Sequence, residues 1–406
     1  MQDASTRRID PAPDEAAGSS RQRPLALFLL LGGIISSAQL GKAIVAMPLL
    51  QSEMSLGIDV VSLIIATFAT LGATLGMGTG LVARRMGARR SLVLGMIVMS
   101  AGSLVGAAAE DPVLLIASRI LEGVGFLGVV VVIPDLLNTF VRGRDRLLFI
   151  GMWGCFMPTG TALMLLLGPV LPTFGWRALW LSQSAVALLY ALAAMAIVPV
   201  AAKSAAVRQG DFLRVARLVL GDRNSRLLAL VFGVYAVQYF ILAGFLPVIL
   251  VGALGLSIAS ASLLTAASVF ANAIGNIAAG ILSRLSFPLW ASMAIAFGAY
   301  AVTAPLIYSA GLPAGWVAIL TGLALGVAGL APGSIFAAVP RIVAPELVTP
   351  TIGLIQQTSN IGQFVGPIAA GLVVHWVGWP AVPIVIFAAA SCGLWAALQL
   401  RARLPR

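Results

Sequence analysis

The chain has 406 residues, of which 60% are apolar and only 10% are charged. A soluble domain carries roughly 25% charged residues because its surface faces water, so this composition excludes an ordinary soluble protein and indicates that lipid is the solvent. The formal net charge of +11 does not indicate a nucleic-acid partner, because the basic residues lie in short loops between apolar runs. That distribution is typical of topology control in membranes.

The chain begins with a polar segment, residues 1–23, which lacks the apolar core of a signal peptide and is predicted to be a disordered cytoplasmic tail. Twelve apolar runs follow, each long enough for a membrane-spanning helix of about 20 residues. A polar interruption at 202–226 divides them into two sets of six. The predicted spans are 25–50, 59–83, 91–109, 113–138, 147–171, 178–201, 227–252, 258–283, 288–309, 314–338, 350–376 and 381–400.

These spans predict four parts besides the leading tail. We expect an N-terminal six-helix bundle over 24–201, a cytoplasmic linker over 202–226, a C-terminal six-helix bundle over 227–401 and a short cytoplasmic tail over 402–406.

The loops predict which side of the membrane the two ends of the chain face. With twelve spans, the basic clusters fall on the side of both termini, and the opposite loops hold Glu53, Asp59, Glu110 and Asp111 with Arg177 as their only basic residue. Because basic loops stay in the cytoplasm, both termini are predicted to be cytoplasmic. An odd number of spans would place one basic end outside, so the charges also support the count.

Several sequence features of the first half repeat in the second half at an offset of about 200 residues. Because each half has an even number of helices, the repeat is parallel, and such halves place a substrate site between them near the middle of the membrane. The matching positions are Gly80 and Arg84 with Gly280 and Arg284, Gly151 and Gly160 with Gly353 and Gly362, and Gly175-Trp176 with Gly378-Trp379.

Two motifs in the first half carry a family resemblance. The segment Gly80-Leu-Val-Ala-Arg84-Arg85-Met-Gly87-Ala-Arg89-Arg90 resembles the loop motif G-x-L-A-D-R-x-G-R-K of the major facilitator superfamily. The segment Arg119-Ile-Leu-Glu122-Gly123-Val-Gly125 resembles that superfamily's R-x-x-Q/E-G-x-G. The resemblance implies an all-α membrane protein whose twelve transmembrane helices form two pseudo-symmetric six-helix bundles, rocking about a central cavity. In overall appearance the chain is similar to the cyanate and nitroimidazole transporter branch.

The chain departs from the superfamily's pattern at two places. Arg84 stands where the loop motif has its acidic residue, which puts the usual ion pair of that motif in doubt. The fifth predicted helix reads Trp153-Gly-Cys-Phe-Met-Pro158-Thr-Gly160 instead of the G-P-x-x-G-G run of drug–proton antiporters. This second departure argues against multidrug efflux.

Ionisable residues inside predicted spans are costly in lipid and are therefore candidate functional residues. At the helical rise, Lys42 lies about 12 Å from the outer end of its helix, and Arg119 and Glu122 lie about 9 and 13 Å from the same side. One interpretation is that Lys42 extends outward to water while Arg119 and Glu122 form a structural pair. The alternative, which we favour, starts from the surplus positive charge of the trio, which a bound anion would neutralise. Lys42 would then bind the anion with Arg119 assisting, and Glu122 would carry a proton.

A fourth intramembrane charge, Asp135, lies near the cytoplasmic end of its helix, directly after Pro134. Its expected partners are Arg85 or Arg89 of the loop motif. Such a pair would act as a gate that closes in one conformation and breaks in another.

Uncharged polar residues form further candidate substrate contacts, because lipid cannot satisfy amides and phenols. Their alternative role is hydrogen bonding between helices. The candidates at helical spacing are Gln356, Asn360 and Gln363 in one span, Asn272 and Asn276 in a second, and Tyr235, Gln238 and Tyr239 in a third, joined by Trp153 and by Gln39 near Lys42.

We therefore predict a secondary active transporter of a small organic or inorganic anion, coupled to protons and working by alternating access. The alternative is an exporter of drugs or metabolites by proton antiport. A membrane-embedded enzyme or signalling scaffold is disfavoured, because with a single histidine and no carboxylate cluster we find no catalytic constellation. The two distant cysteines and the missing nucleotide-binding loop predict no metal and no cofactor. We expect a monomer in the bilayer of a bacterial inner membrane.

Overall fold

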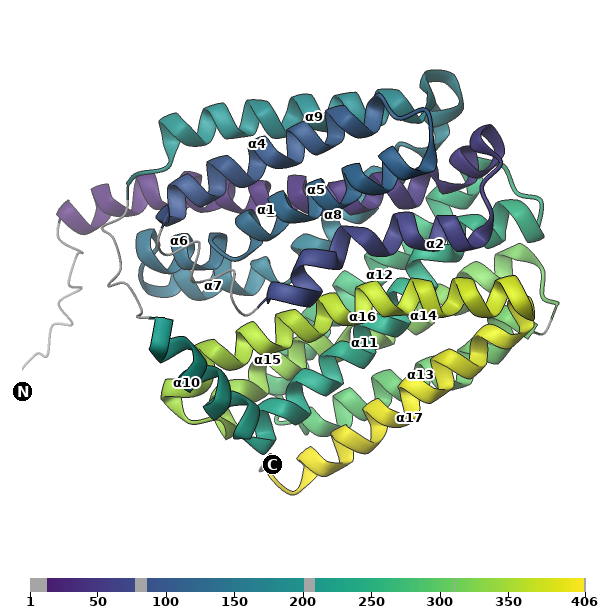
Figure 1. Cartoon of the computed structure of the whole chain (residues 1–406). Helices are drawn as coiled ribbons and strands as arrows, with labels where there is room; N and C mark the ends of the chain where they lie inside the picture. Colours follow the sequence, from purple (N-terminus) through teal and green to yellow (C-terminus); the bar gives the residue numbers. More distant parts are fainter. Residues whose placement is uncertain (1–12, 77–85, 201–208, 310, 405–406) are drawn as a thin grey trace, which may run out of the picture.

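The computed structural model describes residues 13–76, 86–200, 209–309 and 311–404, and within these ranges every regular element is helical. The helices of the first half lie together on one side of the molecule and those of the second half on the other (Figure 1). The first half contains α1 Pro13–Met54, α2 Ile58–Ala66 with the 3-10 turn η1 Thr67–Ala69, α4 Ala88–Ala107, α5 Pro112–Val130, α6 Ile133–Phe140, α7 Gly143–Trp153, α8 Phe156–Leu165, η2 Gly168–Val170 and α9 Leu171–Ile197.

Helix α10, Gln209–Gly221, leads into the second half. That half contains α11 Arg223–Val248, the π-helical turn η3 Ile249–Ala253, α12 Ile258–Arg284, α13 Leu289–Ser309, α14 Ala314–Ala328, α15 Leu330–Ile342, η4 Pro345–Leu347, α16 Val348–Trp376, η5 Trp379–Ala381 and α17 Val382–Arg401.

Ten helical segments of the described residues are long and apolar enough to cross a membrane. One of them, running from Phe156 to Ile197, contains two crossings, because the backbone leaves helical geometry at Gly175, where φ is 76°. Helix α16 is the remaining crossing, since its 29 residues exceed the roughly 20 that a bilayer requires. The predicted fold of twelve transmembrane helices in two bundles is confirmed.

Three spans that the sequence predicts as single helices are broken inside the membrane. A proline ring blocks the preceding helical turn and removes a backbone donor. Accordingly, α5 gives way to α6 just before Pro134, α7 to α8 just before Pro158, and α14 to α15 just before Pro332. Pro134 and Pro332 occupy the fourth span of their respective halves, so the break between α5 and α6 and the break between α14 and α15 are counterparts in the two bundles.

Side-chain caps fix several helix starts at the ends of the bundle. Asp111 accepts hydrogen bonds from the backbone N–H groups of Val113 and Leu114, and Asp222 and Ser257 cap α11 and α12 in the same way. Such caps satisfy donors that have no partner inside the helix and stabilise it by about 1 kcal/mol.

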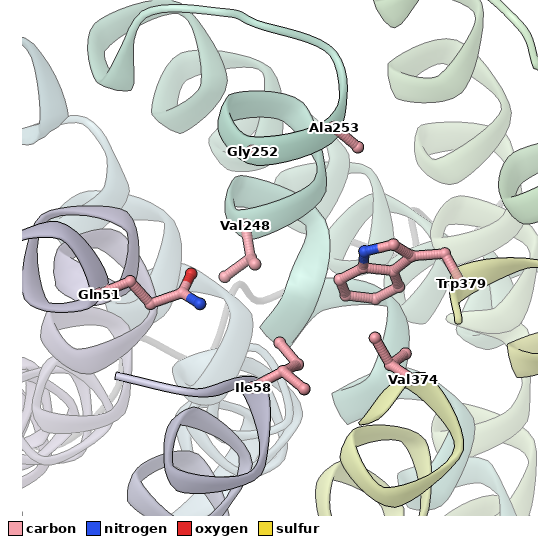
Figure 2. A pocket seen from close by; sticks show the side chains of 7 residues that line it. All are labelled: Gln51, Ile58, Val248, Gly252, Ala253, Val374 and Trp379. Atoms are coloured by element: carbon pink, nitrogen blue, oxygen red, sulfur yellow. The ribbon is translucent and has the colours of Figure 1, made fainter. Parts of the chain in front are cut away.

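The two halves meet along α2 and α16, along α8 and α12, and along α1 and α11. The contact with α16 continues beyond α2 and η1. There a methyl group added to Gly72 would collide with the side chain of Asn360, and Gln357 donates a hydrogen bond to the Ala73 carbonyl at 3.1 Å. A pocket of about 240 Å³ lies between the halves near the α1–α2 connection (Figure 2).

Close helix packing predicts a large effect of a small substitution at Gly123. A Cβ atom there would overlap the backbone carbonyl oxygen of Phe68, which cannot rotate away. We expect Gly123→Ala to lower the free energy of unfolding by about 1–3 kcal/mol, the usual cost of overpacking. The control is Gly353→Ala, because Gly353 is also helical and has open space around it. Thermal unfolding of both purified variants checks this, and equal midpoints would contradict it.

Candidate functional site

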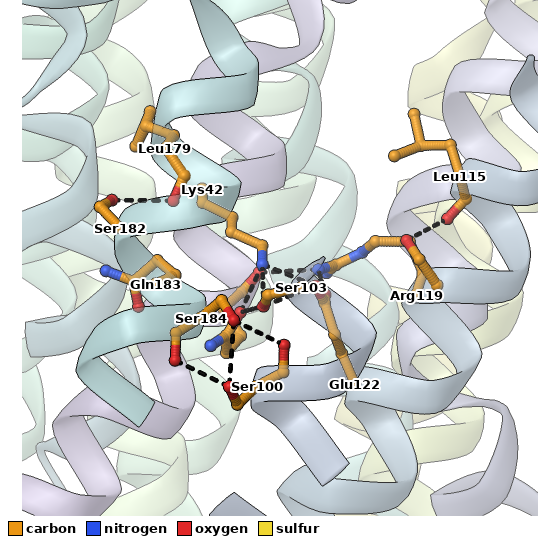
Figure 3. Close-up of polar contacts among 12 residues, drawn as sticks. Lys42, Ser100, Ser103, Leu115, Arg119, Glu122, Leu179, Ser182, Gln183 and Ser184 are labelled. Carbon is orange, nitrogen blue, oxygen red and sulfur yellow. Dashed lines mark hydrogen bonds and ion pairs between the residues drawn. The ribbon is translucent and has the colours of Figure 1, made fainter. Parts of the chain in front are cut away.

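Three ionisable side chains meet in the interior of the first bundle. Lys42 comes from α1, and Arg119 and Glu122 come from successive turns of α5; all three have 0% exposure. Lys42 Nζ lies 2.6 Å from Glu122 Oε1, and Arg119 Nη1 is ion-paired with the other oxygen, Glu122 Oε2. One carboxylate therefore bridges two cations, as Figure 3 shows.

The ammonium group of Lys42 is fully partnered. Besides Glu122, its Nζ donates to Gln39 Oε1 at 2.5 Å and to Ser103 Oγ at 2.6 Å. The Trp180 ring centroid lies 4.8 Å away, a favourable cation–π contact. The side chain thus points into the bundle, so the interpretation in which Lys42 extends outward to water is wrong for this conformation.

Arg119 keeps one donor free. Its Nη1 donates to the Gln39 carbonyl at 2.8 Å, its Nε reaches the Ile64 carbonyl at 3.4 Å, and its Cζ lies 4.6 Å from the Phe68 ring centroid. Its Nη2 is buried without a partner among the described residues, and so is Gln39 Nε2. Buried N–H groups without partners cost about 1–3 kcal/mol each, so these two groups are candidate ligand contacts.

The charges of this cluster do not cancel. Two cations face one carboxylate, which leaves one surplus positive charge in a buried site. An uncompensated charge away from water is expensive, and a bound anion would neutralise it. We call Lys42, Arg119, Glu122, Gln39 and Ser103 the cationic cluster.

Ser103 and Trp180 belong to this neighbourhood but were not predicted from the sequence. Ser103 Oγ donates to Gln39 Oε1 at 2.9 Å and lies 3.0 Å from Glu122 Oε1, and Ser100 hydrogen-bonds to Ser184 of α9 at 3.0 Å (Figure 3). The available signal was the three-residue spacing of Ser100 and Ser103, which places both serines on one face of an apolar helix.

The polar residues of the second half form mainly contacts between helices. Asn272 Nδ2 donates to Tyr235 Oη at 3.0 Å and to the Leu325 carbonyl of α14 at 2.8 Å. Asn276 donates to the Asn272 carbonyl, and Gln238 donates to the Ile386 carbonyl of α17 at 2.9 Å. The bonds to Leu325 and Ile386 join different helices and correspond to the alternative role that the sequence left open, whereas the bond from Asn276 stays within α12.

Two tyrosines of this half lack such partners. Tyr239 Oη and Tyr300 Oη are buried without a hydrogen bond among the described residues, and both rings lie close to Tyr235, at 6.0 and 6.5 Å. Tyr300 was not predicted, because the residues of α13 that precede and follow it are mostly apolar.

The remaining predicted contacts lie near the boundary of the halves or within the first bundle. Asn360 packs against Gly72, which follows the turn η1, and donates to the Gln356 carbonyl at 2.8 Å. Gln363 is buried, with Nε2 unpartnered in the described part of the chain. Trp153 stacks on Phe156 at 4.1 Å.

The predicted gate between Asp135 and Arg89 is not formed in this conformation, and the alternative partner, Arg85, falls outside the described residues. Arg89 donates to the Met195 carbonyl, and Asp135 is exposed and makes no ion pair with any described residue. An ion pair does join Arg23 to Asp145 at 2.8 Å on the same side of the first bundle. The hydrogen bond from Arg23 holds the pKa of the Asp145 carboxyl below its ordinary value.

The sequence is similar to those of two known bacterial proteins. The chain is 25% identical to the hexuronate transporter of Bacillus subtilis (strain 168), over 89% of this chain and 90% of that protein. It is also 25% identical to the methylenomycin A resistance protein of the same organism, over 38% of this chain and 34% of that protein.

Solved structures show the same fold at low sequence identity. A variant of the nucleoside transporter NupG matches with a TM-score of 0.74 and 15% identity, over 94% of this chain and 100% of that one. A bacterial homologue of the human lysosomal transporter Spinster, inward-facing and unoccupied, matches with a TM-score of 0.69 and 16% identity, over 97% and 96%.

The family comparison agrees with these relatives. A family model described as Major Facilitator Superfamily matches residues 29–223 and 228–406. The placement near cyanate and nitroimidazole transporters stays a prediction. The chain therefore belongs to the Major Facilitator Superfamily, whose members are integral membrane transporters of small molecules and not enzymes.

Proposed function

We propose that this transporter imports a small organic carboxylate together with protons, as a monomer in a bacterial inner membrane. The observation that carries the proposal is the buried cationic cluster, with one surplus positive charge and two unpartnered donors, Arg119 Nη2 and Gln39 Nε2. A carboxylate accepts two hydrogen bonds side by side and supplies the missing negative charge. We assign Arg119 and Gln39 the first contact, and Lys42 a supporting electrostatic role.

Glu122 is the proposed proton carrier. In the structure it holds both cations, so a substrate carboxylate must compete with it for them. A proton on Glu122 removes that competitor and doubles the surplus charge of the cluster from one to two. Proton and anion therefore favour each other's binding, and this coupling is reciprocal. The proton and the anion would each bind weakly alone, so the site would be occupied mainly when both are bound. This is what coupled transport requires.

The proposed orientation places both termini in the cytoplasm, because the basic loops lie on that side. The α1–α2 connection, which is flanked by Glu53 of α1 and Asp59 of α2, then faces outward. Alternating access would expose the space between the two bundles first to the outside and then to the cytoplasm. The other polar residues of α11, α12 and α16, with Trp153 of α7, stay predicted substrate contacts.

The long match to a hexuronate transporter supports an anionic substrate, because a hexuronate carries a carboxylate. A competing candidate is export of drugs or metabolites by proton antiport, which the match to the methylenomycin A resistance protein favours. That match covers about a third of each chain, against nine-tenths for the hexuronate transporter.

A ligand screen on the purified protein tests the proposed substrate class. We expect glucuronate, galacturonate or a smaller carboxylate to raise the thermal unfolding midpoint, since a ligand at one hundred times its Kd stabilises by about 2.7 kcal/mol. Glucuronamide is the matched control for glucuronate, because it keeps the sugar and removes the charge. Stabilisation by the amide as strong as by the acid, or by tetraphenylphosphonium and no carboxylate at all, would favour the exporter and overturn the proposal.

A further inference from the structure

The pocket between the halves near the α1–α2 connection is distinct from the cationic cluster. The two share helix α1, on which Gln51 of the pocket lies about 13 Å beyond Lys42 at the helical rise. The volume of the pocket is about 240 Å³, and both halves contribute to its wall (Figure 2). The residues that line it are Gln51 of α1, Ile58 of α2, Val248 of α11, Gly252 and Ala253 of η3, Val374 of α16 and Trp379 of η5.

The volume indicates the size of a molecule that the pocket can hold. An apolar cavity of about 150 Å³ holds one benzene molecule, whereas pockets for drug-sized ligands begin at roughly 300 Å³. At about 240 Å³, this pocket suits a molecule of one or two fused rings.

The lining favours an aromatic occupant. Ile58, Val248 and Val374 supply an apolar surface, and the Trp379 indole lies at its side (Figure 2). Two other aromatic rings pack against that indole. The Tyr308 ring is stacked on it with the ring centroids 6.2 Å apart, and the Phe245 ring is edge-on with the centroids 5.8 Å apart. A rigid aromatic wall suits ring stacking, which contributes about 0.5–1.5 kcal/mol beyond the area that is buried.

The polar groups and charges favour an uncharged occupant with a hydrogen-bonding group. The side chain of Gln51 makes no hydrogen bond to any described residue, and Figure 2 shows its amide directed toward the pocket. None of the lining residues is charged. Glu53 and Asp59, which flank Gln51 and Ile58 in the sequence, repel anions. The pocket therefore differs from the cationic cluster in the charge that it accepts.

The backbone supports a binding role for this place. Gly252 and Ala253 belong to a π-helical turn, and such turns occur frequently at functional sites. A Cβ atom added to Gly252 would meet no atom within 4 Å, so this stretch of backbone faces open space and not a packed neighbour.

We propose that this pocket binds a small uncharged aromatic molecule with an N–H or O–H group, of the size of indole, and that the bound molecule slows transport. The ring lies beside Trp379, and the polar group bonds to Gln51. Because the wall comes from both halves, the pocket exists only while α1 and α2 stay close to α11 and α16. A ligand that binds this conformation shifts the population toward it, which opposes the rocking of the bundles.

The test measures binding of tritiated indole to the purified full-length protein, with excess unlabelled indole correcting for partition into detergent. We expect one saturable site per chain. Trp379→Ala removes the ring wall, and Gly252→Leu fills the space without a backbone clash. We expect each to weaken binding by about tenfold, or roughly 1.4 kcal/mol.

Two matched variants control for general damage. Trp376→Ala removes a tryptophan that is 79% exposed and lies three residues before Trp379, outside the pocket. Gly315→Leu adds the same side chain at another helical glycine with open surroundings. Both are expected to bind indole like the wild type. No saturable binding, unchanged binding in both pocket variants, or equal loss in the controls would overturn the proposal, whatever the transported substrate proves to be.

Discussion

Replacing Glu122 by Gln is expected to destabilise the protein and to uncouple transport from protons. The substitution leaves the Lys42 ammonium and the Arg119 guanidinium buried together, with no described carboxylate in reach. Breaking a buried ion pair by removing one partner costs about 3–5 kcal/mol, because the remaining charge is uncompensated. Thermal unfolding of the purified variant measures this loss. Carboxylate uptake into proteoliposomes, with and without a pH gradient, measures the coupling.

A second substitution separates charge from packing. The Glu122→Gln, Lys42→Met pair restores the wild-type surplus of one positive charge, so we expect it to recover much of the lost stability without recovering proton coupling. Glu110→Gln changes an exposed carboxylate and is expected to alter neither property. If uptake by Glu122→Gln depended on the pH gradient as strongly as uptake by the wild type, Glu122 would not be the proton carrier.

Much of this fold was predictable, because a membrane-spanning helix in lipid requires a long run of apolar residues. Each span must satisfy its backbone internally and present an apolar surface, so the runs of apolar residues and the basic loops predicted twelve helices in two halves. The proline breaks were harder to predict. A spanning helix tolerates proline when its neighbours satisfy the freed backbone groups, so Pro134 and Pro332 interrupt their spans whereas Pro367 lies inside α16.

The site was predictable in its ionisable residues and not in its hydrogen bonds. Intramembrane charges are rare, so Lys42, Arg119 and Glu122 stood out, and helical depth indicated that they could meet. Which donors remain free depends on rotamers and on neighbouring helices, neither of which a single sequence specifies. Ser103 satisfies Lys42 in the structure, which moves the first substrate contact in our proposal from Lys42 to Arg119.

The same limit applies to the amides of the second half. Spacing placed Asn272 and Gln238 on polar helix faces, but a polar face in a bundle can meet either a cavity or another helix. In this conformation both side chains donate to carbonyls of neighbouring helices, α14 and α17. Whether such a side chain lines a cavity or bonds to another helix depends on contacts between helices that are distant in the sequence.

Arg119→Lys is expected to weaken carboxylate binding by about 10- to 100-fold while leaving the charge of the site unchanged. Lysine keeps the positive charge but has no second, fixed N–H group to replace Nη2, and a guanidinium fork matches a carboxylate where an ammonium does not. A hydrogen bond to a charged group contributes about 1.5–3 kcal/mol, which sets the size of the effect. The measurement is the Kd of the carboxylate that stabilises the wild type, with the unfolding midpoint recorded in parallel.

Arg177→Lys supplies the matched comparison. Like Arg119, Arg177 lies over an aromatic ring, with its Cζ 4.3 Å from the Trp176 ring centroid, and donates to a backbone carbonyl, that of Ala109 at 2.9 Å. It is not part of the cationic cluster, so its substitution should leave carboxylate affinity unchanged. Equal affinities in Arg119→Lys and the wild type would show that surplus charge alone attracts the anion, and the first contact would then return to Lys42. A loss in Arg119→Lys alone, with Lys42 and Glu122 intact, would identify the unpartnered Nη2 as the group that recognises the substrate.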